Sequence, residues 1–324
     1  RDRRAGPVDR PRALIGAVRA FARRYLPDDG PVCVALSGGP DSLALTSAAV
    51  RAGLSVEALV VDHGLQSGSA AVASTAAATA ESLGAQARVL TVVVGSDGGL
   101  EAAARSARYE ALEAAREDRP VLLGHTLDDQ AETVLLGLAR GSGPASLSGM
   151  REWRPPWGRP LLGLRRADTV AACAAWGLSP VDDPHNSDPR FTRVRVRTEV
   201  LPLMEDVLGG GVAQALARTA DMLAADSDVL EELSSELLDR ARGPEGLSVA
   251  ELAVVPEALR TRALRRWLRD DDEVGELSSR VMAAVDALVV DWHGQGPVAV
   301  GGDRRTRRVV ARRGDLLEID STDR

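Results

Sequence analysis

The sequence predicts a doubly wound α/β fold with a mainly parallel sheet, followed by a long helical connector and a small α+β C-terminal domain. Short apolar strands alternate with helices from residue 31 onward, as in a parallel sheet covered on both faces. One helical pattern then runs without a breaker until Gly243 and Pro244. At 324 residues the chain is long enough for two domains. We expect an N-terminal helix and turn (1–30), an α/β domain (31–210), a connector (211–242) and a C-terminal domain (243–324).

The elements are expected in the following order. Apolar residues at helical spacing predict a helix over 10–26, and Pro27 to Gly30 predict a turn. The strands of the sheet are expected at 32–36, 56–61, 87–93 and 121–123. Helices are expected at 43–52 and 70–83, a longer one runs from the turn at 95–99 to residue 116, and another grows out of the segment 124–133 and ends at residue 139. A further helix is expected at 165–176, and loops at 153–158 and 182–189. The C-terminal domain should contain helices at 256–269 and 278–290 and short strands such as 297–300 and 316–319.

The first strand ends at a glycine-rich turn with the sequence Ser37-Gly38-Gly39-Pro40-Asp41-Ser42. Two glycines let the backbone approach an anion, and Asp41 and Ser42 are expected to cap the next helix, whose amides carry partial positive charge. A Walker P-loop is excluded because the chain contains no lysine, and no G-x-G-x-x-G fingerprint follows the strand. Ser-Gly-Gly turns are often only structural, but the strand before this one and the helix after it predict a nucleotide phosphate site.

Polar side chains also follow two other predicted strands. Asp62 and His63 come after the second strand, and His125, Asp128 and Asp129 come after the fourth. Because ligands of open α/β sheets bind at the carboxyl ends of the strands, we expect these groups to converge with the glycine-rich turn. Two histidines alone do not make a metal site, so we assign them to nucleotide or substrate contacts.

Two charged groups have a purely structural alternative. Asp128, Asp129 and Glu132 share one face at a helix start, where acidic residues also stabilise the helix dipole. Arg105 shares a helical face with Glu101 and Arg108, so an ion pair within the helix would explain these three residues.

Composition limits the class of protein. Cys33 and Cys173 are the only cysteines, lack zinc-site spacing and are expected in the core, which disfavours sulfur transfer.

No apolar run reaches the roughly 18 residues of a membrane span, so we expect a cytoplasmic protein without a membrane partner. The net charge of −7 argues against nucleic acid, but arginines cluster at 190–197, 260–269 and 304–313. A solvated arginine surface is the alternative; three clusters favour a polyanionic partner.

Several motifs together resemble one family. The glycine-rich turn resembles the PP-loop of the ATP pyrophosphatases, and further motifs in the same order resemble the tRNA(Ile)-lysidine synthetases within that superfamily. These motifs are Val61-Asp-His-Gly-Leu65, Glu101-Ala-Ala-Ala-Arg105 with Arg108-Tyr109, His125-Thr-Leu-Asp-Asp-Gln-Ala-Glu-Thr133, Arg140-Gly-Ser-Gly143, Pro160-Leu-Leu162, Asp188-Pro-Arg-Phe-Thr-Arg193, Val200-Leu-Pro-Leu-Met204 and Trp292-His-Gly-Gln-Gly-Pro297. Gln66, His185 and the segment 143–146 depart from the family pattern.

The resemblance implies an adenine nucleotide alpha hydrolase type of Rossmann-like sheet and an enzyme that uses ATP to join free L-lysine to carbon 2 of the wobble cytidine in tRNA(Ile) with a CAU anticodon. An adenylated tRNA intermediate would form, with release of pyrophosphate and then AMP. The catalytic residues would be Asp41, Arg105, Asp128 and Asp129. The implied ligand sets are Ser37, Gly38, Gly39, Pro40, Asp41, Ser42, Asp62 and His63 for ATP; Asp41 for Mg²⁺; His125, Asp128, Asp129 and Glu132 for lysine or cytidine; and Arg140, Arg190, Arg193, Arg195 and Arg197 for tRNA.

Two other functions remain open on the sequence. Another PP-loop ligase, of the amidotransferase or argininosuccinate synthetase type, would share the glycine-rich turn without needing the arginine clusters or the C-terminal domain. An ATP-binding or RNA-binding regulatory module would make the polar groups at the strand ends a coincidence. The oligomeric state is open, and a homodimer is possible.

Overall fold

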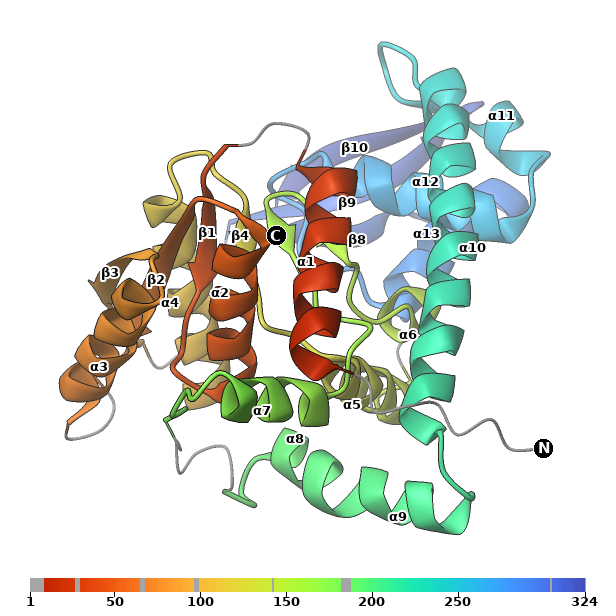
Figure 1. Cartoon of the computed structure of the whole chain (residues 1–324). Coiled ribbons are helices and arrows are strands. Elements are labelled where there is room, and N and C mark those ends of the chain that lie inside the picture. The colour runs from red at the N-terminus through yellow and green to blue at the C-terminus, as the bar shows by residue number, and fades with distance from the viewer. Residues whose placement is uncertain are drawn as a thin grey trace. The chain divides into compact units, whose positions relative to one another are not determined.

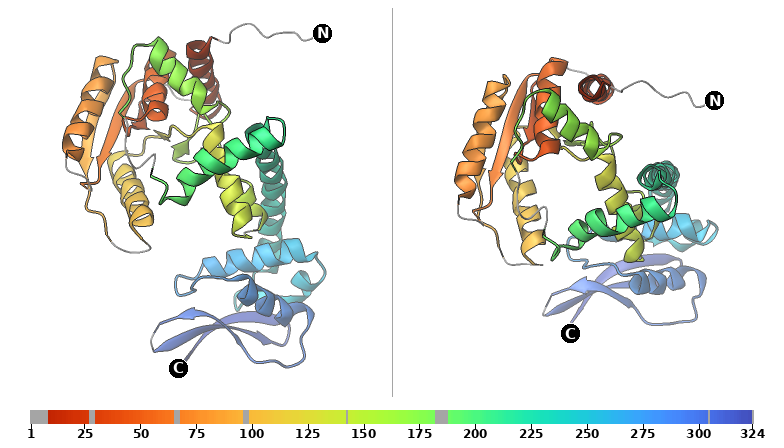
Figure 2. Two further views of the ribbon diagram at one scale, coloured as in Figure 1. Left: turned by 90° about the horizontal axis from the view of Figure 1, so that it is seen from below. Right: turned by 60° about the horizontal axis from the view of Figure 1, so that its bottom comes forward.

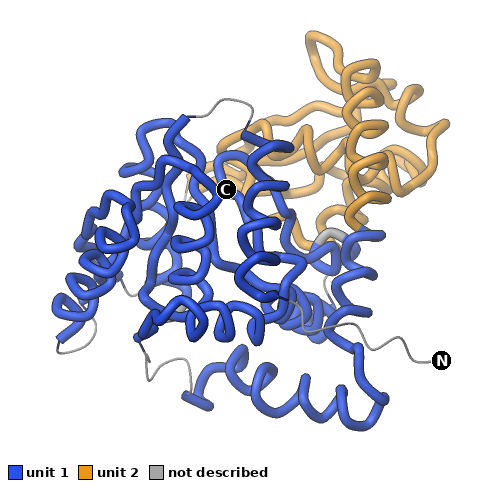
Figure 3. Tube along the Cα trace, in the orientation of Figure 1, with its two compact units in different colours: residues 1–223 blue, residues 224–324 orange. Residues whose placement is uncertain are grey.

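The computed structural model describes residues 9–26, 30–64, 68–95, 99–141, 143–181, 188–303 and 305–323. The chain divides into two compact units, residues 1–223 and 224–324 (Figure 3). Gln66, His185 and Arg304 lie outside the described residues, as do Leu65 and Ser142 of the motifs and most of the loop expected at 182–189.

Unit 1 contains the α/β sheet. Its strands are β1 (Val32–Ala35), β2 (Val56–Asp62), β3 (Gln86–Thr91), β4 (Val121–Leu122), β5 (Trp153–Arg154) and β6 (Trp157–Gly158). Its helices are α1 (Arg10–Tyr25), α2 (Pro40–Ala52), α3 (Ser69–Ser82), α4 (Leu100–Ala115), α5 (Leu127–Ala139), α6 (Pro144–Leu147), α7 (Arg166–Ala175), α8 (Thr192–Arg195), the π-helical turn η2 (Val196–Val200) and α9 (Leu201–Val207). Helix α10 (Val212–Ala241) begins in unit 1 and ends in unit 2.

The strand order is β3-β2-β1-β4-β6-β5. The pairs from β3 through β6 are parallel, and only β5 pairs antiparallel with its neighbour. Strand β1 therefore lies between β2 and β4, and the chain reverses its direction of progress across the sheet at this point. Ligands of open α/β sheets bind at such a switch point, outside the carboxyl ends of the strands. The expected mainly parallel α/β fold is confirmed.

Helices cover both faces of this sheet (Figures 1 and 2). On one face α1, α2, α3 and α7 form the main core, which includes Leu14, Phe21 and Leu43. On the other face α4 contributes Leu112 to a smaller cluster with Cys33 and Val121. Cys33 and Cys173 are both free and buried, and burial raises the pKa of each thiol, that of Cys173 to about 11.

Unit 2 contains a separate antiparallel sheet with the order β7-β10-β9-β8. Its elements after α10 are β7 (Leu247–Ser248), α11 (Val249–Ala253), α12 (Glu257–Arg269), α13 (Ser279–Val290), β8 (Val298–Gly302), β9 (Thr306–Arg313) and β10 (Leu316–Asp323). Leu247, Leu264 and Val310 belong to its core. In this unit Arg260 is buried and its guanidinium Nε donates to Asp286 at 2.6 Å.

Some boundaries differ from those expected. Helix α2 begins at Pro40, three residues early, because proline is compatible with the first helical position, and Gly39 is its N-cap. Asp41 and Ser42 therefore lie inside the first turn, and the expectation that they cap the helix was wrong. Strands β5 and β6 occupy the segment expected as a loop at 153–158. Arg307, Arg308, Arg312 and Arg313 of the third cluster lie on β9, a strand that was not expected there because we read the segment only as charge.

No single helix among the described residues is long and apolar enough to cross a membrane. The helical segments Thr192–Val207 and Val212–Ala241 would have the necessary length and composition only as a pair, and the chain bends by 99° between them.

Candidate functional site

The loop after β1 is built around two serines. The backbone amide of Ser37 donates to Ser42 Oγ at 3.2 Å, and Ser42 Oγ donates to the carbonyl of Gly39 at 3.1 Å. Gly38 has φ of +83°, the left-handed region that favours glycine. These contacts fold the loop back over the start of α2, so that its amides and the positive end of the helix dipole face the same side. This arrangement suits the phosphates of a nucleotide.

Asp41 lies in the first turn of α2 and is held by α7. One carboxylate oxygen accepts from Arg166 Nε at 2.9 Å, and the other accepts from the hydroxyl of Thr169. Burial raises the pKa of Asp41 above its ordinary value, although Arg166 and Thr169 act in the opposite direction. Among the described residues no group of three acidic, His or Cys side chains is placed to hold a metal by itself. The Asp41 carboxylate beside the phosphate loop is of the kind that Mg²⁺ takes together with substrate phosphates.

Helix α5 begins beside this loop. Thr126 is its N-cap, and Asp129 reaches back so that Oδ2 accepts from the Thr126 amide and hydroxyl, each at 2.8 Å. A β-carbon on Gly124 would lie 2.9 Å from the carbonyl carbon of Asp41 and from the amide of Ser42. The strand end before α5 is therefore packed directly against the backbone of the phosphate loop. This close approach brings Asp129 near Asp41.

The acidic side chains of α5 are each paired with arginines. Glu132 is fully buried, and Arg193 Nε and Arg197 Nε donate to its two oxygens at 2.8 and 2.7 Å. Asp128 accepts from Arg165, with the closest contact at 2.9 Å from Nη2. Four carboxylates (Asp41, Asp128, Asp129 and Glu132) thus meet four guanidiniums (Arg165, Arg166, Arg193 and Arg197).

Asp129 has the most cationic neighbours of the four. Its Oδ1 accepts from Arg166 Nη2 at 2.9 Å and from Arg197 Nη2 at 3.3 Å. Burial by itself would raise the pKa of Asp129, but Arg166 and the two hydrogen bonds from Thr126 outweigh it, so the pKa is lowered. Asp129 is therefore ionised at neutral pH, with its charge paired to these guanidiniums.

The two histidines occupy different surroundings. Burial lowers the pKa of His125 to about 3, with Arg159 acting in the same direction and Asp129 opposing it. Arg159 Nε donates to His125 Nδ1 at 3.3 Å. Burial and the charge of Arg108 lower the pKa of His63, whose Nδ1 is buried without a hydrogen-bond partner. Both imidazoles are neutral at pH 7.

Asp62, at the carboxyl end of β2, and Arg105, on α4, have different partners. Asp62 Oδ1 accepts from the amide of Gly64 at 3.0 Å, and this hydrogen bond lowers the pKa of Asp62. The Arg105 guanidinium lies over the Tyr109 ring, 4.9 Å from its centroid, and Nη2 donates to the tyrosine hydroxyl at 3.3 Å. The side chain of Glu101 lies outside the described residues, so its expected pairing with Arg105 stays a prediction.

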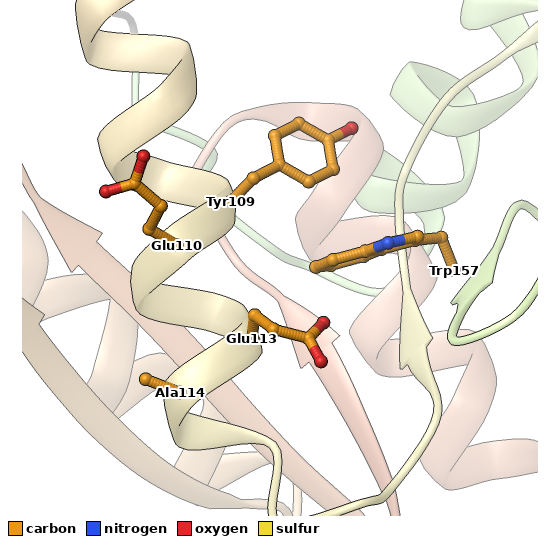
Figure 4. Close-up of a pocket in the computed structure, with 5 residues that line it drawn as sticks. All are labelled: Tyr109, Glu110, Glu113, Ala114 and Trp157. Carbon is orange, nitrogen blue, oxygen red and sulfur yellow. The ribbon is translucent and has the colours of Figure 1, made fainter. Parts of the chain in front are cut away.

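Two hollows lie near these groups. A shallow groove of about 550 Å³ is lined by Tyr109, Glu110, Glu113 and Ala114 of α4 and by Trp157 of β6, whose ring meets Tyr109 edge to face (Figure 4). A smaller pocket of about 240 Å³ lies on the acidic cluster instead. It is lined by Asp128, Glu132, Arg165, Arg197, Leu201, Pro202, Glu205 and Ala213. The smaller pocket offers carboxylates next to an apolar wall, which suits a cation on an aliphatic chain.

The arginines expected to bind tRNA fall into two groups. Arg193 and Arg197 point into the site and hold Glu132, whereas Arg190 and Arg195 are exposed and pair with Asp188 and Glu199. Arg140 is exposed at the C-cap of α5, eleven residues beyond Asp129 and so about 16 Å along the helix axis. It lies at the end of α5 opposite the acidic residues.

Sequence reasoning missed Arg159, Arg165, Arg166 and Thr169. A signal for two of them was present, since Arg165 and Arg166 occupy the N-cap and first position of α7, where the helix dipole disfavours cations. Arginines at such a position need nearby acceptors, and the predicted acidic residues of the site are these acceptors.

Comparison with known proteins agrees with the geometry. A family described as the PP-loop domain matches residues 17–204, and the TilS substrate binding domain matches residues 247–317. The chain is similar to proteins named tRNA(Ile)-lysidine synthase from Nocardia farcinica (61% identity, covering 93% of this chain and 95% of the relative) and Rhodococcus erythropolis (57%, covering 94% of each). Over 66% of its length the chain shares its fold with the U34-tRNA thiolase NcsA from Methanococcus maripaludis, of which 79% is covered (TM-score 0.55, 16% identity).

Proposed function

Because this chain belongs to the tRNA(Ile)-lysidine synthase family and is a ligase with a PP-loop ATP-binding domain, we propose that its acidic cluster holds free L-lysine beside the bound nucleotide. The reaction forms lysidine at carbon 2 of the wobble cytidine of tRNA(Ile) with a CAU anticodon. The observation that carries this proposal is the convergence of the phosphate loop and the acidic start of α5, which Gly124 packs together.

In the first half-reaction the cytidine carbonyl oxygen attacks the α-phosphate of ATP, and pyrophosphate leaves. Ser37, Gly38, Gly39 and Ser42 would hold the phosphates at the start of α2. Hydrogen bonds between the two serines keep the loop in shape. Asp41 would hold Mg²⁺, which supplies charge neutralisation of the phosphates. Arg105 carries a positive charge at the same sheet edge for the transferring phosphoryl group.

In the second half-reaction the ε-amine of lysine displaces AMP from the cytidine. Asp128, Asp129 and Glu132 would attract the ammonium group, and a carboxylate of this cluster would accept the proton that leaves before attack. The pocket beside them supports this assignment, because Leu201, Pro202 and Ala213 provide an apolar wall for the methylene chain.

The tRNA partner would be held by arginines that are not engaged in the site. Arg140, Arg190 and Arg195 are exposed in unit 1, and Arg266 and Arg269 are exposed on α12 in unit 2. Contacts of this kind with phosphates position a nucleic acid without reading its sequence. We further propose the four-part domain division given above (1–30, 31–210, 211–242 and 243–324), a cytoplasmic location, and a homodimer as a possible assembly.

Incorporation of labelled lysine into an unmodified isoleucine tRNA transcript with a CAU anticodon tests this function. The matched control is the same transcript with the wobble cytidine changed to uridine. Incorporation that needs ATP and occurs only with cytidine is the expected result. AMP release without lysine transfer would favour another PP-loop ligase, and absence of ATP turnover would favour a regulatory module.

A further inference from the structure

One guanidinium joins the two halves of the site. Arg166 Nε donates to Asp41 Oδ2 at 2.9 Å, and Arg166 Nη2 donates to Asp129 Oδ1 at 2.9 Å. Asp41 belongs to the phosphate loop on α2, and Asp129 belongs to the acidic start of α5. A third helix, α7, therefore supplies the cation that these two carboxylates share.

The position of Arg166 is unfavourable unless it is held by these partners. It occupies the first turn of α7, where the helix dipole opposes a positive charge, and three quarters of its side chain is inaccessible to solvent. The backbone amide of Arg166 also donates to Asp128 Oδ2 at 2.7 Å. The acidic cluster thus binds both the main chain and the side chain of this residue.

The partners of Arg166 differ in what would remain if the arginine moved. Asp129 keeps Arg197 at 3.3 Å and both hydrogen bonds from Thr126. Asp41 keeps only the hydroxyl of Thr169, and no other ion pair of Asp41 is found among the described residues. Release of Arg166 would therefore leave Asp41, and not Asp129, with an uncompensated charge that a divalent ion could neutralise.

We propose that Arg166 is an internal counter-cation that competes with Mg²⁺·ATP for Asp41. It neutralises Asp41 while no nucleotide is bound and gives up that carboxylate when the metal–nucleotide complex enters, keeping its contact with Asp129. This inference rests on the proposed function, because it takes Mg²⁺·ATP as the ligand of Asp41. Arg166 acts as a positioning residue that sets how much Mg²⁺ the enzyme needs before it binds ATP.

The test is ATP binding to the full chain by calorimetry over a series of free Mg²⁺ concentrations. Arg166→Gln removes the competing charge, so the Mg²⁺ concentration for half-maximal binding should fall about tenfold, the factor expected for one charge-assisted hydrogen bond. In Arg166→Lys the same Mg²⁺ midpoint should fall by a smaller factor. The lysine keeps a positive charge that competes for Asp41, but one ammonium group cannot bridge both carboxylates as a guanidinium fork does. Arg51→Gln is the matched control and should leave the midpoint unchanged, because this exposed arginine lies in the last turn of α2, ten residues and so about 15 Å along the helix axis from Asp41.

Thermal unfolding provides a readout without turnover. Arg166→Gln should lower Tm in the absence of ligand and show a larger rise in Tm with Mg²⁺·ATP than wild type, because ligand binding no longer breaks an ion pair. If Arg166→Gln binds Mg²⁺·ATP more weakly at every Mg²⁺ concentration, Arg166 supports the phosphates and the inference is overturned. Where Arg166→Gln does not fold, an unchanged or higher Mg²⁺ midpoint in Arg166→Lys overturns it. Wild-type protein that binds no ATP at all would instead contradict the proposed function.

Discussion

Asp41 and Asp129 share Arg166, but their other contacts assign them to different steps. Asp41 lies in the first turn of α2, whereas Asp129 lies in the first turn of α5, accepts from the N-cap Thr126 and contacts Arg197. We expect Asp41→Asn and Asp129→Asn each to reduce lysine incorporation about 100-fold or more, with ATP binding damaged only in Asp41→Asn. Incorporation assays and calorimetry with ATP measure the two effects separately.

The control for this pair is Asp206→Asn, which removes one carboxylate from an exposed position on α9. This variant should retain both lysine incorporation and ATP binding. Full lysine incorporation by Asp129→Asn would remove Asp129 from the proposed lysine site.

His125 gives a pH dependence whose sign follows from its buried state. The pKa of His125 is lowered to about 3 in the folded protein, mainly by burial, and is near 6.5 in an unfolded chain. Between pH 6.5 and 3 the unfolded state therefore binds a proton that the folded state does not, and the free energy of unfolding falls as the pH falls through this range. Urea unfolding at several pH values should show a shallower decline in His125→Gln than in wild type. The same slope in both proteins would mean that His125 is protonated in the folded state.

The convergence of polar side chains at the strand ends was predicted from the sequence, but their pairings with arginines were not. Side chains at strand ends must converge in a parallel sheet, which located Asp41, His125 and Asp129. Arg193 looked like a phosphate contact because sequence does not reveal that a helix distant along the chain places it on Glu132. Pairings over this sequence separation depend on tertiary packing.

At the scale of elements, the approach of β4 to α2 fixes the site. Gly124→Ala would place a β-carbon 2.9 Å from the carbonyl carbon of Asp41 and from the amide of Ser42. Both are backbone atoms that cannot rotate away, so we expect a loss of about 1–3 kcal/mol in the free energy of unfolding and weaker ATP binding. Chemical denaturation and calorimetry measure these two quantities.

Gly16→Ala is the matched control for that change. Gly16 lies within α1, and a β-carbon there meets nothing within 4 Å. This substitution should stabilise the protein by roughly 0.5–1 kcal/mol through helix propensity and leave ATP binding unchanged. Equal behaviour of the two variants would contradict a steric role for Gly124.

The π-helical turn shows where element prediction fails for a physical reason. Pro202 lies just after η2, and proline lacks an amide and its ring clashes with the carbonyl four residues earlier. Widening the preceding turn relieves this clash. The proline was visible in the sequence, but it equally permitted a helix end. The regular helices around it, such as α10, were predicted within a residue or two because their apolar spacing is unbroken.

At the scale of the molecule, the net charge of −7 conceals a division among the arginines. Some neutralise buried carboxylates, as Arg260 does with Asp286, and others are exposed. We expect the double change Arg266→Gln and Arg269→Gln to weaken tRNA binding and to reduce the slope of log affinity against log salt by up to about 2. ATP binding should be retained.

The same measurement on Arg19→Gln, which removes an exposed arginine of α1 in unit 1, serves as the charge control and should leave the salt slope unchanged. An unaltered slope in the α12 double variant would exclude that helix from the tRNA contact.

The overall architecture was predictable because periodicity and strand-end chemistry repeat along the chain. The short strands β5 and β6 were not, since two-residue strands carry no periodic signal.

The burial of both cysteines has a practical consequence for solution studies. Cys33 and Cys173 are inaccessible and their raised pKa values keep them as unreactive thiols at neutral pH. If one cysteine is introduced at an exposed position in each unit, these two cysteines would therefore be the thiols open to maleimide dyes. Single-molecule energy transfer between two such dyes can follow the distance between the units during a catalytic cycle, without first removing a native thiol.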